Sequence, residues 1–493
     1  MDYIYKTVPY AHQERVFLAS RDKANFALLM EMGTGKTKVT IDTAAWLYNK
    51  GAINAVLVVA PNGVHRNWVL NEIPAHLPDY IESRIAYWNA GARKEEKKQY
   101  KRLWDTSFQG LRILTMNVEA FSTKRGTVEA EKFLTVFNSM FVVDESSKIK
   151  TPGATRTKTL LRLSTRAKYK RILNGTLITQ SPLDAYTQFY FLEPQILGFT
   201  SYYAFKNYFA IWERKQNFKT GHKYQIITGF RNLDELKTRI KRHSYRVLKA
   251  ECLDLPAKIY VKYYVDLTGE QTKLYKEISN QLKVLFQTEK IMDGVINAKL
   301  AITKLIRLQQ IVGGYITVDN EVTGASEFVE IVRPENNPKV KMLVDIAEEC
   351  SGKIIIWARF VKEIEAIRNI LKKEFGEQAV VAYYGAVSAD EKAGNVAAFQ
   401  NNNEVRFFIG QQHSAGYGLT LTAANTVVYF SNDFSLEARL QSEDRAHRIG
   451  QQNHVTYIDL EAGNTIDTKI ISALRSKKNL ADIITGDNVL DWI

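Results

Sequence analysis

The sequence predicts an α/β protein built from two parallel-sheet lobes with helical material between them. Short apolar runs alternate with stretches of helical periodicity over the first 180 residues, and the same rhythm returns from residue 353 onward. Strands that are apolar along their whole length are typical of parallel sheets covered by helices on both faces. A chain of 493 residues is long enough for about two to four domains, each with its own core.

The individual elements follow from apolar runs that are bounded by turn residues. In the first lobe we expect a helix over 37–48 and strands at 25–30, 55–60, 111–116, 140–144 and 171–174. In the second lobe we expect strands at 353–357, 380–384, 405–409, 426–430 and 454–460. The resulting division is a first lobe over 1–190, an insertion over 191–254 and a second lobe over 255–493.

The segments between the two sets of strands have compositions of their own. Residues 191–254 are rich in aromatic and basic residues, and we expect a packed helical insertion there. A helical segment is expected near 268–335, with apolar residues at helical spacing up to residue 312. Toward the end of this segment, residues 319–338 hold Asn, Gly, Glu and Pro and are predicted to form a loop.

The basic residues are concentrated in one part of the chain. The whole sequence has 67 Lys and Arg against 53 Asp and Glu, a net charge of +14. Residues 1–250 carry +19 and residues 251–493 carry −5, while the stretch 151–250 alone carries +14. A positive field confined to one region favours a polyanionic partner, most simply nucleic acid.

The cysteine content and the hydropathy exclude several classes of protein. Two cysteines, Cys252 and Cys350, argue against a disulfide framework or a cysteine-rich zinc site and favour a reducing compartment. No apolar run approaches the roughly 20 residues needed to span a bilayer. The first nine residues do not resemble the core of a signal peptide. We therefore expect a protein that is neither secreted nor embedded in a membrane.

The sharpest local motif is the run from Gly33 through Thr34, Gly35 and Lys36 to Thr37, which follows a predicted strand and opens a predicted helix. Backbone N–H groups in such a turn, aided by the helix N-terminus, bind phosphate. Lys36 would contact the β- and γ-phosphates of a nucleotide, and Thr37 would bind Mg²⁺. The full phosphate-loop pattern has Gly six residues before the Lys, where this chain has Met30.

Two further motifs hold candidate catalytic side chains. Asp144 and Glu145 end a buried strand, at the place where open α/β sheets bind ligands. Asp144 suits Mg²⁺ coordination through water, and Glu145 suits polarising an attacking water. In the second lobe, Arg445 and Arg448 are three apart and would share a face if helical. Arginines supplied by a partner lobe stabilise the charge of phosphoryl transfer, although a solvated basic helix face is the alternative.

Taken in order, these motifs resemble those of superfamily-two helicase-type ATPases of the Swi/Snf group. The stretch Asp444–Gln451 is similar to the group's motif VI and is the most diagnostic. The other matching segments, in chain order, are His12-Gln13, Glu31–Thr37, Val58–Trp68, Asp144–Lys150, Gly175-Thr176, Arg242–Pro256, Leu305–Tyr315, Lys353–Phe360, Tyr384–Phe399 and Ser414–Leu421.

The resemblance implies two RecA-like lobes that hold ATP and Mg²⁺ between them and move along DNA. Gln13 would recognise adenine, and Gly418, in the Gly-rich segment before motif VI, would contact the nucleotide. DNA, duplex or branched, would be held through its backbone without sequence preference. The chain is similar to compact bacterial or phage-encoded members, which implies a cytoplasmic protein acting on bare, branched or protein-bound DNA more than on chromatin.

Three segments depart from the pattern of the group. Ser146-Ser147 stands where Ala-His is common, which implies a different coupling between hydrolysis and movement. The segment Asn174–Leu177 begins with Asn where the group has Thr, and Gln411–His413 lacks the usual Ser-Thr. None of these changes removes a group that hydrolysis requires.

Two other functions remain open on the sequence alone. A strand-separating DNA or RNA helicase would share the motor. A nucleotide-gated DNA-binding scaffold with little hydrolysis belongs to a different class, and the presence of Glu145, Arg445 and Arg448 together argues against it. Branch migration and protein displacement are equally compatible with a translocase.

Overall fold

The computed structural model describes most of the chain and divides it into two compact units. The described residues are 3–62, 64–88, 94–175, 177–178, 181–216, 223–252, 256–289, 305–319, 326–412, 419–433, 435–448, 450–472 and 474. Among them, the first unit holds the chain up to Ile211 and from Gly229 to Cys252. The second unit holds Trp212–Thr228 and the chain from Pro256.

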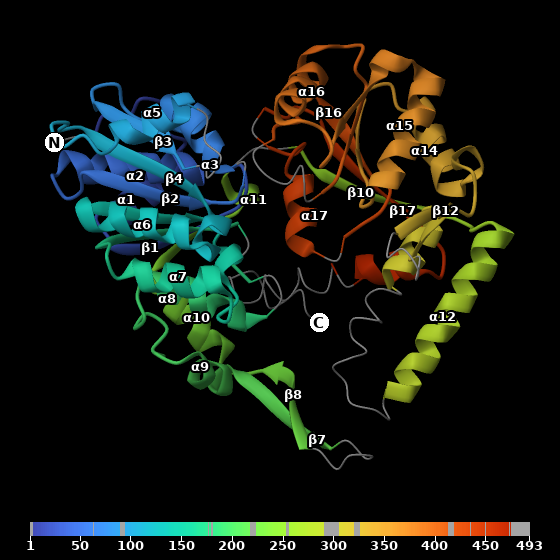
Figure 1. Ribbon diagram of the computed structural model, residues 1–493, viewed down its shortest axis with the longest axis horizontal. Helices are drawn as coiled ribbons and strands as arrows, with labels where there is room; N and C mark the ends of the chain where they lie inside the picture. The colour runs from blue at the N-terminus through green and yellow to red at the C-terminus, as the bar shows by residue number, and fades with distance from the viewer. Residues whose placement is uncertain are drawn as a thin grey trace. The chain divides into compact units, whose positions relative to one another are not determined.

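The first unit is built on a seven-stranded parallel sheet of order β3-β4-β2-β5-β6-β1-β9. In Figure 1 the strands β1, β2, β3 and β4 of this sheet are labelled among the helices of the unit. Its strands are β1 (Asn25–Met30), β2 (Ala55–Ala60), β3 (Ser83–Tyr87), β4 (Leu111–Asn117), β5 (Ser139–Asp144), β6 (Tyr169–Leu173) and β9 (Ser244–Val247). β2 and β5 are buried at every position, because helices cover both faces of the sheet.

Helices lie between the strands of the first unit. They are α1 (Ala11–Ser20), α2 (Lys36–Asn49), α3 (Val64–Asn67), α4 (Ile73–His76), α5 (Lys94–Arg102), α6 (Lys124–Val136), α7 (Thr155–Ser164), α8 (Ala185–Leu192), α9 (Tyr202–Phe209), α10 (Leu233–Arg242) and α11 (Lys249–Cys252). Side chains alternate between the faces of β5. Met140 and Val142 join the core shared with α1 and α2, while the Phe141 ring packs against Phe191 of α8 with centroids 5.0 Å apart.

The insertion at 191–254 is not purely helical, which corrects the sequence-based expectation. Between α9 and α10 the chain forms a two-stranded hairpin of β7 (Ala210–Gln216) and β8 (Lys223–Phe230). The residues of β8 include the β-branched run Ile226-Ile227-Thr228, which favours a strand over a helix. The last part of the segment, β9, pairs with β1 and so completes the main sheet of the first unit.

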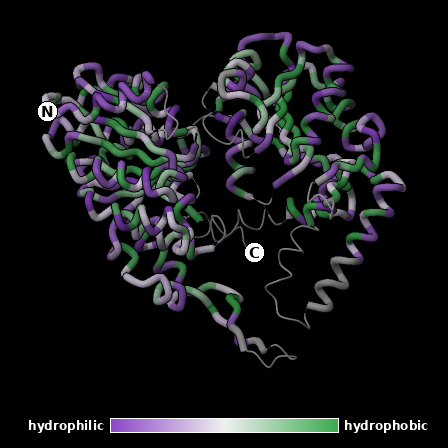
Figure 2. The backbone as a smooth tube through the Cα atoms, viewed as in Figure 1, coloured by the Kyte–Doolittle hydropathy of each residue, from purple (hydrophilic) through white to green (hydrophobic). Residues whose placement is uncertain are grey.

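The second unit is built on a six-stranded parallel sheet of order β10-β17-β16-β13-β15-β14. Its strands are β10 (Lys258–Val265), β13 (Lys353–Trp357), β14 (Val380–Tyr383), β15 (Phe407–Gly410), β16 (Ala424–Tyr429) and β17 (Val455–Ala462). The prediction of two parallel-sheet α/β lobes is therefore confirmed. In Figure 2 the strands that cross the middle of each unit are coloured as the hydrophobic part of the chain.

The helices of the second unit are α12 (Gly269–Glu289), α14 (Pro338–Glu349), α15 (Val361–Phe375), α16 (Ala389–Asn401) and α17 (Leu436–Glu443). The expected loop at 319–338 is wrong in part, because β11 (Tyr315–Asp319) pairs with β12 (Ser326–Glu330) as an antiparallel hairpin. Phe328 and Val329 favour a strand, although the Asn, Gly and Pro residues around them are typical of a loop.

Candidate active site

Four neighbouring strands of the first unit end at segments that hold the predicted site residues or the motifs of the group. β2, β5, β6 and β1 are consecutive in the sheet and parallel, so their carboxyl ends lie along one edge. Beyond these ends lie, respectively, the segment leading to Trp68, the pair Asp144-Glu145, Asn174, and the loop at 31–35. This edge is where an open parallel sheet binds its ligand.

The loop after β1 has the backbone that a phosphate site requires. Gly33 and Gly35 have φ of 79° and 91°, conformations that are strained for residues with a Cβ. A Cβ on Gly35 would also overlap the side-chain amide of Gln13. Lys36 is the first residue of α2, a helix of 14 residues, and Thr37 lies partly exposed in its first turn. The N–H groups of this turn have no partner within the helix and are available to an anion.

Lys36 is held against the backbone of the same loop. Its ammonium donates hydrogen bonds to the carbonyl oxygens of Met30 at 2.8 Å and Glu31 at 3.3 Å. The Thr34 hydroxyl donates to the Glu31 carbonyl at 2.7 Å, and Thr34 is fully buried. Lys36 is only 8% exposed, and its ammonium lies at the start of the loop, against the carbonyl oxygens of Met30 and Glu31.

Gln13 is connected to the phosphate loop through Thr34. Its amide Nε2 donates to the Thr34 carbonyl at 3.2 Å, and its Oε1 accepts from the backbone N–H of Tyr10 at 3.1 Å. The same Thr34 carbonyl lies 2.8 Å from Nε2 of His12, which carries the proton there because a carbonyl can only accept. The start of α1 is therefore fixed to the loop that would bind the phosphates.

Asp144 and Glu145 are both buried at the end of β5, each 7% exposed. The indole Nε1 of Trp68 donates to Oδ2 of Asp144 at 2.9 Å, and the backbone N–H of Glu145 donates to Oδ1 at 2.9 Å. Burial raises the pKa of Asp144, while the Trp68 hydrogen bond and the nearby charge of Lys36 favour the ionised form. Glu145 adopts a left-handed backbone, with φ 50° and ψ 58°, so its side chain leaves the strand direction.

The two arginines of the second unit meet at one backbone carbonyl. Nη1 of Arg445 and Nη1 of Arg448 both donate to the oxygen of Leu419, at 3.3 and 3.2 Å. They do not share a helix, because α17 ends at Glu443 and the chain turns after it. Arg445 is buried and Arg448 is partly exposed. Their role toward a nucleotide stays a prediction, as does that of Gly418, which lies outside the described residues.

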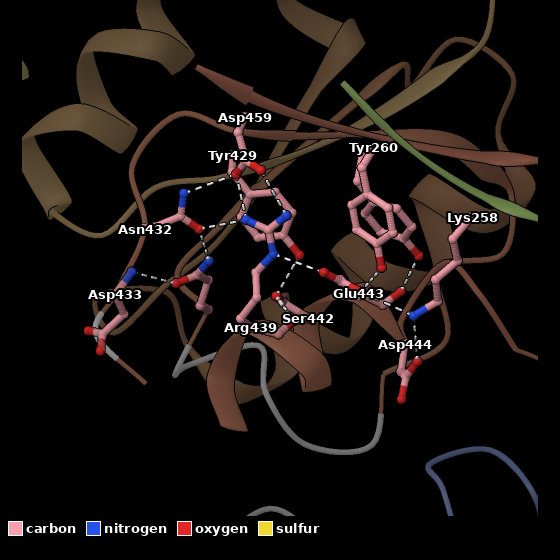
Figure 3. A network of polar contacts seen from close by, with 12 residues as sticks. Lys258, Tyr260, Tyr429, Asn432, Asp433, Arg439, Ser442, Glu443, Asp444 and Asp459 are labelled. Atoms are coloured by element: carbon pink, nitrogen blue, oxygen red, sulfur yellow. Dashed lines mark hydrogen bonds and ion pairs between the residues drawn. The ribbon is translucent and has the colours of Figure 1, made fainter. Parts of the chain in front are cut away.

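A buried ionic network fixes α17 ahead of these arginines (Figure 3). The guanidinium of Arg439 donates to Oδ1 of Asp459 at 2.5 Å and to Oε1 of Glu443 at 2.9 Å. Its carbon lies 3.5 Å from the centroid of the Tyr429 ring, and Nη1 also donates to Asn432 Oδ1 at 2.8 Å. Because α17 is anchored to β16 and β17 in this way, the turn that follows it begins from a fixed position.

Glu443 is also bound from the edge strand β10. Its Oε2 accepts from Nζ of Lys258 at 3.1 Å and from the hydroxyl of Tyr260 at 2.8 Å. Burial acts to raise the pKa of Glu443, but the positive charges of Lys258 and Arg439 outweigh it and lower the pKa to about 2. The carboxylate therefore remains ionised throughout the physiological range.

Comparison with known proteins places the chain in a family. Residues 12–313, more than half of the sequence, match the SNF2-related domain, and residues 338–450 match the helicase conserved C-terminal domain. The chain belongs to the SNF2-related family. The resemblance to Swi/Snf-type ATPases that the motifs predicted is thereby confirmed.

Individual relatives of this SNF2-related chain are similar at modest identity. An uncharacterized ATP-dependent helicase of Mycoplasma genitalium is 26% identical over 455 residues, covering 91% of this chain and 39% of the relative. The DNA annealing helicase and endonuclease ZRANB3 of Bos taurus is 27% identical over 478 residues, covering 96% of this chain and 40% of the relative. The chain thus spans about two fifths of the length of these curated relatives.

Among solved structures, the SWI2/SNF2 ATPase core of Sulfolobus solfataricus in complex with dsDNA is similar to this SNF2-related chain. The two are 27% identical with a TM-score of 0.42, covering 99% of this chain and 95% of the other.

The residues of the first unit fit a nucleotide with Mg²⁺. Within the described ranges, no group of three or more His, Cys, Asp or Glu is placed to hold a metal ion by itself. Mg²⁺ in nucleotide sites is commonly held by one or two protein oxygens together with phosphate oxygens and water. The carboxylate of Asp144 and the hydroxyl of Thr37 are oxygens of this kind. Across the described residues, no helix is long and apolar enough to cross a membrane.

The structure shows contacts at the site from residues that had no predicted role. Trp68 lies in a segment that resembles motif Ia, but nothing in the spacing indicates its bond to Asp144, 76 residues away. Arg439 and Asp459 form the network of Figure 3 from α17 and β17. Gln188 of α8 contacts Ser146 and belongs to none of the motifs. A pairing between distant elements of this kind is visible only once the sheet order is known.

Proposed function

We propose that this SNF2-related chain is a DNA-dependent ATPase that moves along duplex or branched DNA without sequence preference. The observation that carries the proposal is the grouping of Lys36, Asp144 and Glu145 at one edge of a single sheet, beyond the ends of β1 and β5, which β6 separates. A buried ammonium, a buried carboxylate pair and a glycine loop opening a helix are the parts needed for phosphoryl transfer to water.

The residues of the first unit would divide the work of hydrolysis. The N–H groups at the start of α2 would bind the phosphates, and Lys36 would exchange its two loop carbonyls for phosphate oxygens. Mg²⁺, held through Thr37 and Asp144, would neutralise charge on the phosphates. Glu145 would orient and deprotonate the attacking water, and burial of its side chain excludes other water from it. Gln13 would bind adenine, and its hydrogen bond to the Thr34 carbonyl would connect adenine binding to the phosphate loop.

Arg445 and Arg448 would supply positive charge to the transferred phosphate from the second unit. Family membership supports this assignment, since a helicase C-terminal domain matches residues 338–450. Of the two, Arg448 is the more exposed and the better candidate for direct contact, while buried Arg445 would position the turn. Hydrolysis would then depend on closure of the two units, and product release on their opening.

DNA is the proposed partner because of the basic surplus in 151–250 and the names of the relatives. Some of these basic residues already have partners or are buried within the protein: Arg171 is fully buried, and Arg162 and Arg166 pair with Glu131. Exposed cations remain on α7, on β7 and on α10, namely Lys158, Arg214, Lys241 and Arg242. Contacts from such residues read the charge and shape of the backbone. ZRANB3, a DNA annealing helicase by name, supports DNA as the partner, and action on branched DNA is part of the proposal.

A strand-separating helicase is the second candidate within the same class. The matched helicase C-terminal domain is compatible with it. A translocase would displace a third strand from a triplex without melting the duplex, while a helicase would unwind a tailed duplex. A nucleotide-gated scaffold would release one phosphate per molecule and then stop.

The test is ATP turnover by the full chain with no DNA and with single-stranded, duplex, forked and four-way DNA. We expect stimulation by duplex or branched DNA that declines as salt rises. Lys36→Ala and Glu145→Gln are expected to lower turnover by at least about 100-fold, with Glu145→Gln still binding ATP. Equal turnover with and without every DNA would contradict the proposal, and near-normal turnover in both variants would contradict the site.

A further inference from the structure

Ser146, Asn174 and Gln188 form a buried hydrogen-bonded cluster beside Glu145. The hydroxyl of Ser146 donates to Oε1 of Gln188 at 2.6 Å. The amide of Asn174 donates to the same Oε1 at 3.1 Å and to the Ser146 hydroxyl at 3.3 Å. All three side chains are at most 2% exposed. The cluster therefore joins the end of β5, the end of β6 and the helix α8.

The orientation of the Gln188 amide is fixed by its other contacts. Its Nε2 faces the carbonyl oxygens of Leu177 and Asp184, at 2.9 and 2.8 Å, and both can only accept. Oε1 must therefore face Ser146 and Asn174, so the amide cannot rotate without losing four hydrogen bonds. A side chain held in this way is a rigid support for what it touches.

The supported residue next to the cluster is in a strained conformation. Glu145 has φ 50° and ψ 58°, a region that is unfavourable for non-glycine residues and persists only where neighbours hold it. Ser146 is the next residue and the first of the 3₁₀ turn Ser146–Ile149. Its bond to Gln188 fixes the chain immediately after the strained residue, and β5 fixes it immediately before.

Two hydroxyl side chains provide a comparison, because each is the sequence neighbour of a residue of the cluster. Ser147 and Thr187 are also buried, yet neither hydroxyl has a hydrogen-bond partner among the residues that the structure describes. Hydrogen bonding in this region is therefore specific to Ser146 and Gln188 and does not extend to the neighbouring hydroxyls of Ser147 and Thr187. Ser146 and Asn174 are also two of the positions at which the sequence departs from the pattern of the group, and the structure brings both onto one side chain.

We propose that Ser146, Asn174 and Gln188 act together as positioning residues that hold Glu145 in the geometry required for water attack. This inference rests on the proposed ATPase function and on Glu145 as its general base. The cluster touches no reacting atom in this assignment. It acts on the rate of the chemical step and leaves the phosphate loop, and so the affinity for ATP, unchanged.

The experiment compares Ser146→Ala with Thr187→Val in the full chain, because the buried hydroxyl of Thr187 has no hydrogen-bond partner among the described residues and lies outside the motifs. For each variant, kcat and KM for ATP are measured at saturating duplex DNA, with the affinity for a fluorescent ATP analogue and the melting temperature. We expect Ser146→Ala to lower kcat about tenfold, the effect of one displaced hydrogen bond on a barrier, with KM and analogue affinity within about twofold. Thr187→Val is expected to match the wild type.

A second pair of variants guards against a trivial loss of folding. Asn174→Ala should lower kcat in the same way, and the double variant Ser146→Ala/Asn174→Ala should be no worse than the more severe single variant, because both act through one cluster. Equal kcat for Ser146→Ala and Thr187→Val overturns the inference, as does a parallel fall of kcat, analogue affinity and melting temperature. Absence of turnover in the wild-type protein refutes the proposed function itself, a result distinct from either.

Discussion

The indole nitrogen of Trp68 donates a 2.9 Å hydrogen bond to Oδ2 of Asp144, joining two segments that are 76 residues apart in the chain. Both residues are buried, at 2% and 7% exposure. A carboxyl group in such a place favours its neutral form unless donors stabilise the charge. The Trp68 hydrogen bond therefore opposes the effect of burial on the pKa of Asp144 and favours its ionised form near Lys36.

Replacement of Trp68 by Phe should shift the pH dependence of ATP turnover. Burial already raises the pKa of Asp144, and loss of the Trp68 donor raises it further. Because the ionised carboxylate is the active form, activity falls at a higher pH in the variant as the medium is made more acidic. The measurement is kcat/KM for ATP between pH 5 and 8. Trp88→Phe, at another buried Trp of the same unit, is the control, and an acidic limb shared by all three proteins would exclude this role for Trp68.

Arg439→Leu should destabilise the second unit strongly. The substitution leaves the carboxylates of Asp459 and Glu443 buried without their shared partner, which costs about 3–5 kcal/mol in comparable sites. Arg166→Leu is the matched control, because its pair with Glu131 lies at the surface and contributes about 0–1 kcal/mol. Urea unfolding of the two variants measures the difference. A similar loss of unfolding free energy in both variants would show that the network of Figure 3 contributes no more to stability than a surface ion pair.

Glu363 should make the stability of the second unit depend on pH. Burial raises the pKa of this carboxyl to about 7, against the donor Ser431 and the charge of Lys339. A folded-state pKa above the unfolded value means that stability is complete below about pH 4.5 and is lost as the pH rises through 7. Glu363→Gln removes the titration and retains an acceptor oxygen for Ser431. Relative to wild type, the variant should gain up to about 3 kcal/mol between pH 5 and pH 8.

The measurement is the melting temperature of both proteins across that range, with Glu365→Gln as control. Glu365 lies on the same helix but is exposed, so its substitution should leave the pH dependence as it is in the wild type. A constant difference in melting temperature between Glu363→Gln and wild type from pH 5 to 8 would contradict the assignment.

The exposed pair at the end of α10 should contribute to DNA binding through phosphate contacts. If Lys241 and Arg242 each neutralise one phosphate, replacing both by Ala reduces the slope of log affinity against log salt by about 2. Arg162→Ala/Arg166→Ala removes the same charge from residues that pair with Glu131, and serves as the control. Fluorescence anisotropy with a duplex at several salt concentrations gives the slopes. Identical slopes for the two double variants would place the DNA elsewhere.

The sequence predicted what depends on local patterns and missed what depends on contacts between distant segments. Fully apolar runs such as Ala55–Ala60 are recognisable because both faces of their strand are buried. The edge strand Ser83–Tyr87 has only one fully buried residue and escaped notice. The phosphate loop was predictable because glycines with positive φ, a lysine and a helix start occur within five residues. The spacing of Arg445 and Arg448 would put them on one face only if their segment were helical. The chain instead turns after Glu443, and the carbonyl oxygen of Leu419 accepts a hydrogen bond from both.

The hydrogen-bond partners of the site could not be read from spacing. Gln188 looks like one more polar residue in an aromatic helix, and its role appears only when α8 is placed against the ends of β5 and β6. The same holds for Trp68, whose contact with Asp144 follows from the neighbouring positions of β2 and β5 in the sheet.

Displacement of the third strand from a DNA triplex tests the central claim most directly, because it requires movement along a duplex and no melting of it. With ATP, the wild-type chain should release the third strand from a triplex that carries a duplex arm for loading, and Lys36→Ala should not. ATP turnover on the same DNA without any release above the Lys36→Ala background would contradict translocation, and the chain would then be an ATPase of another kind.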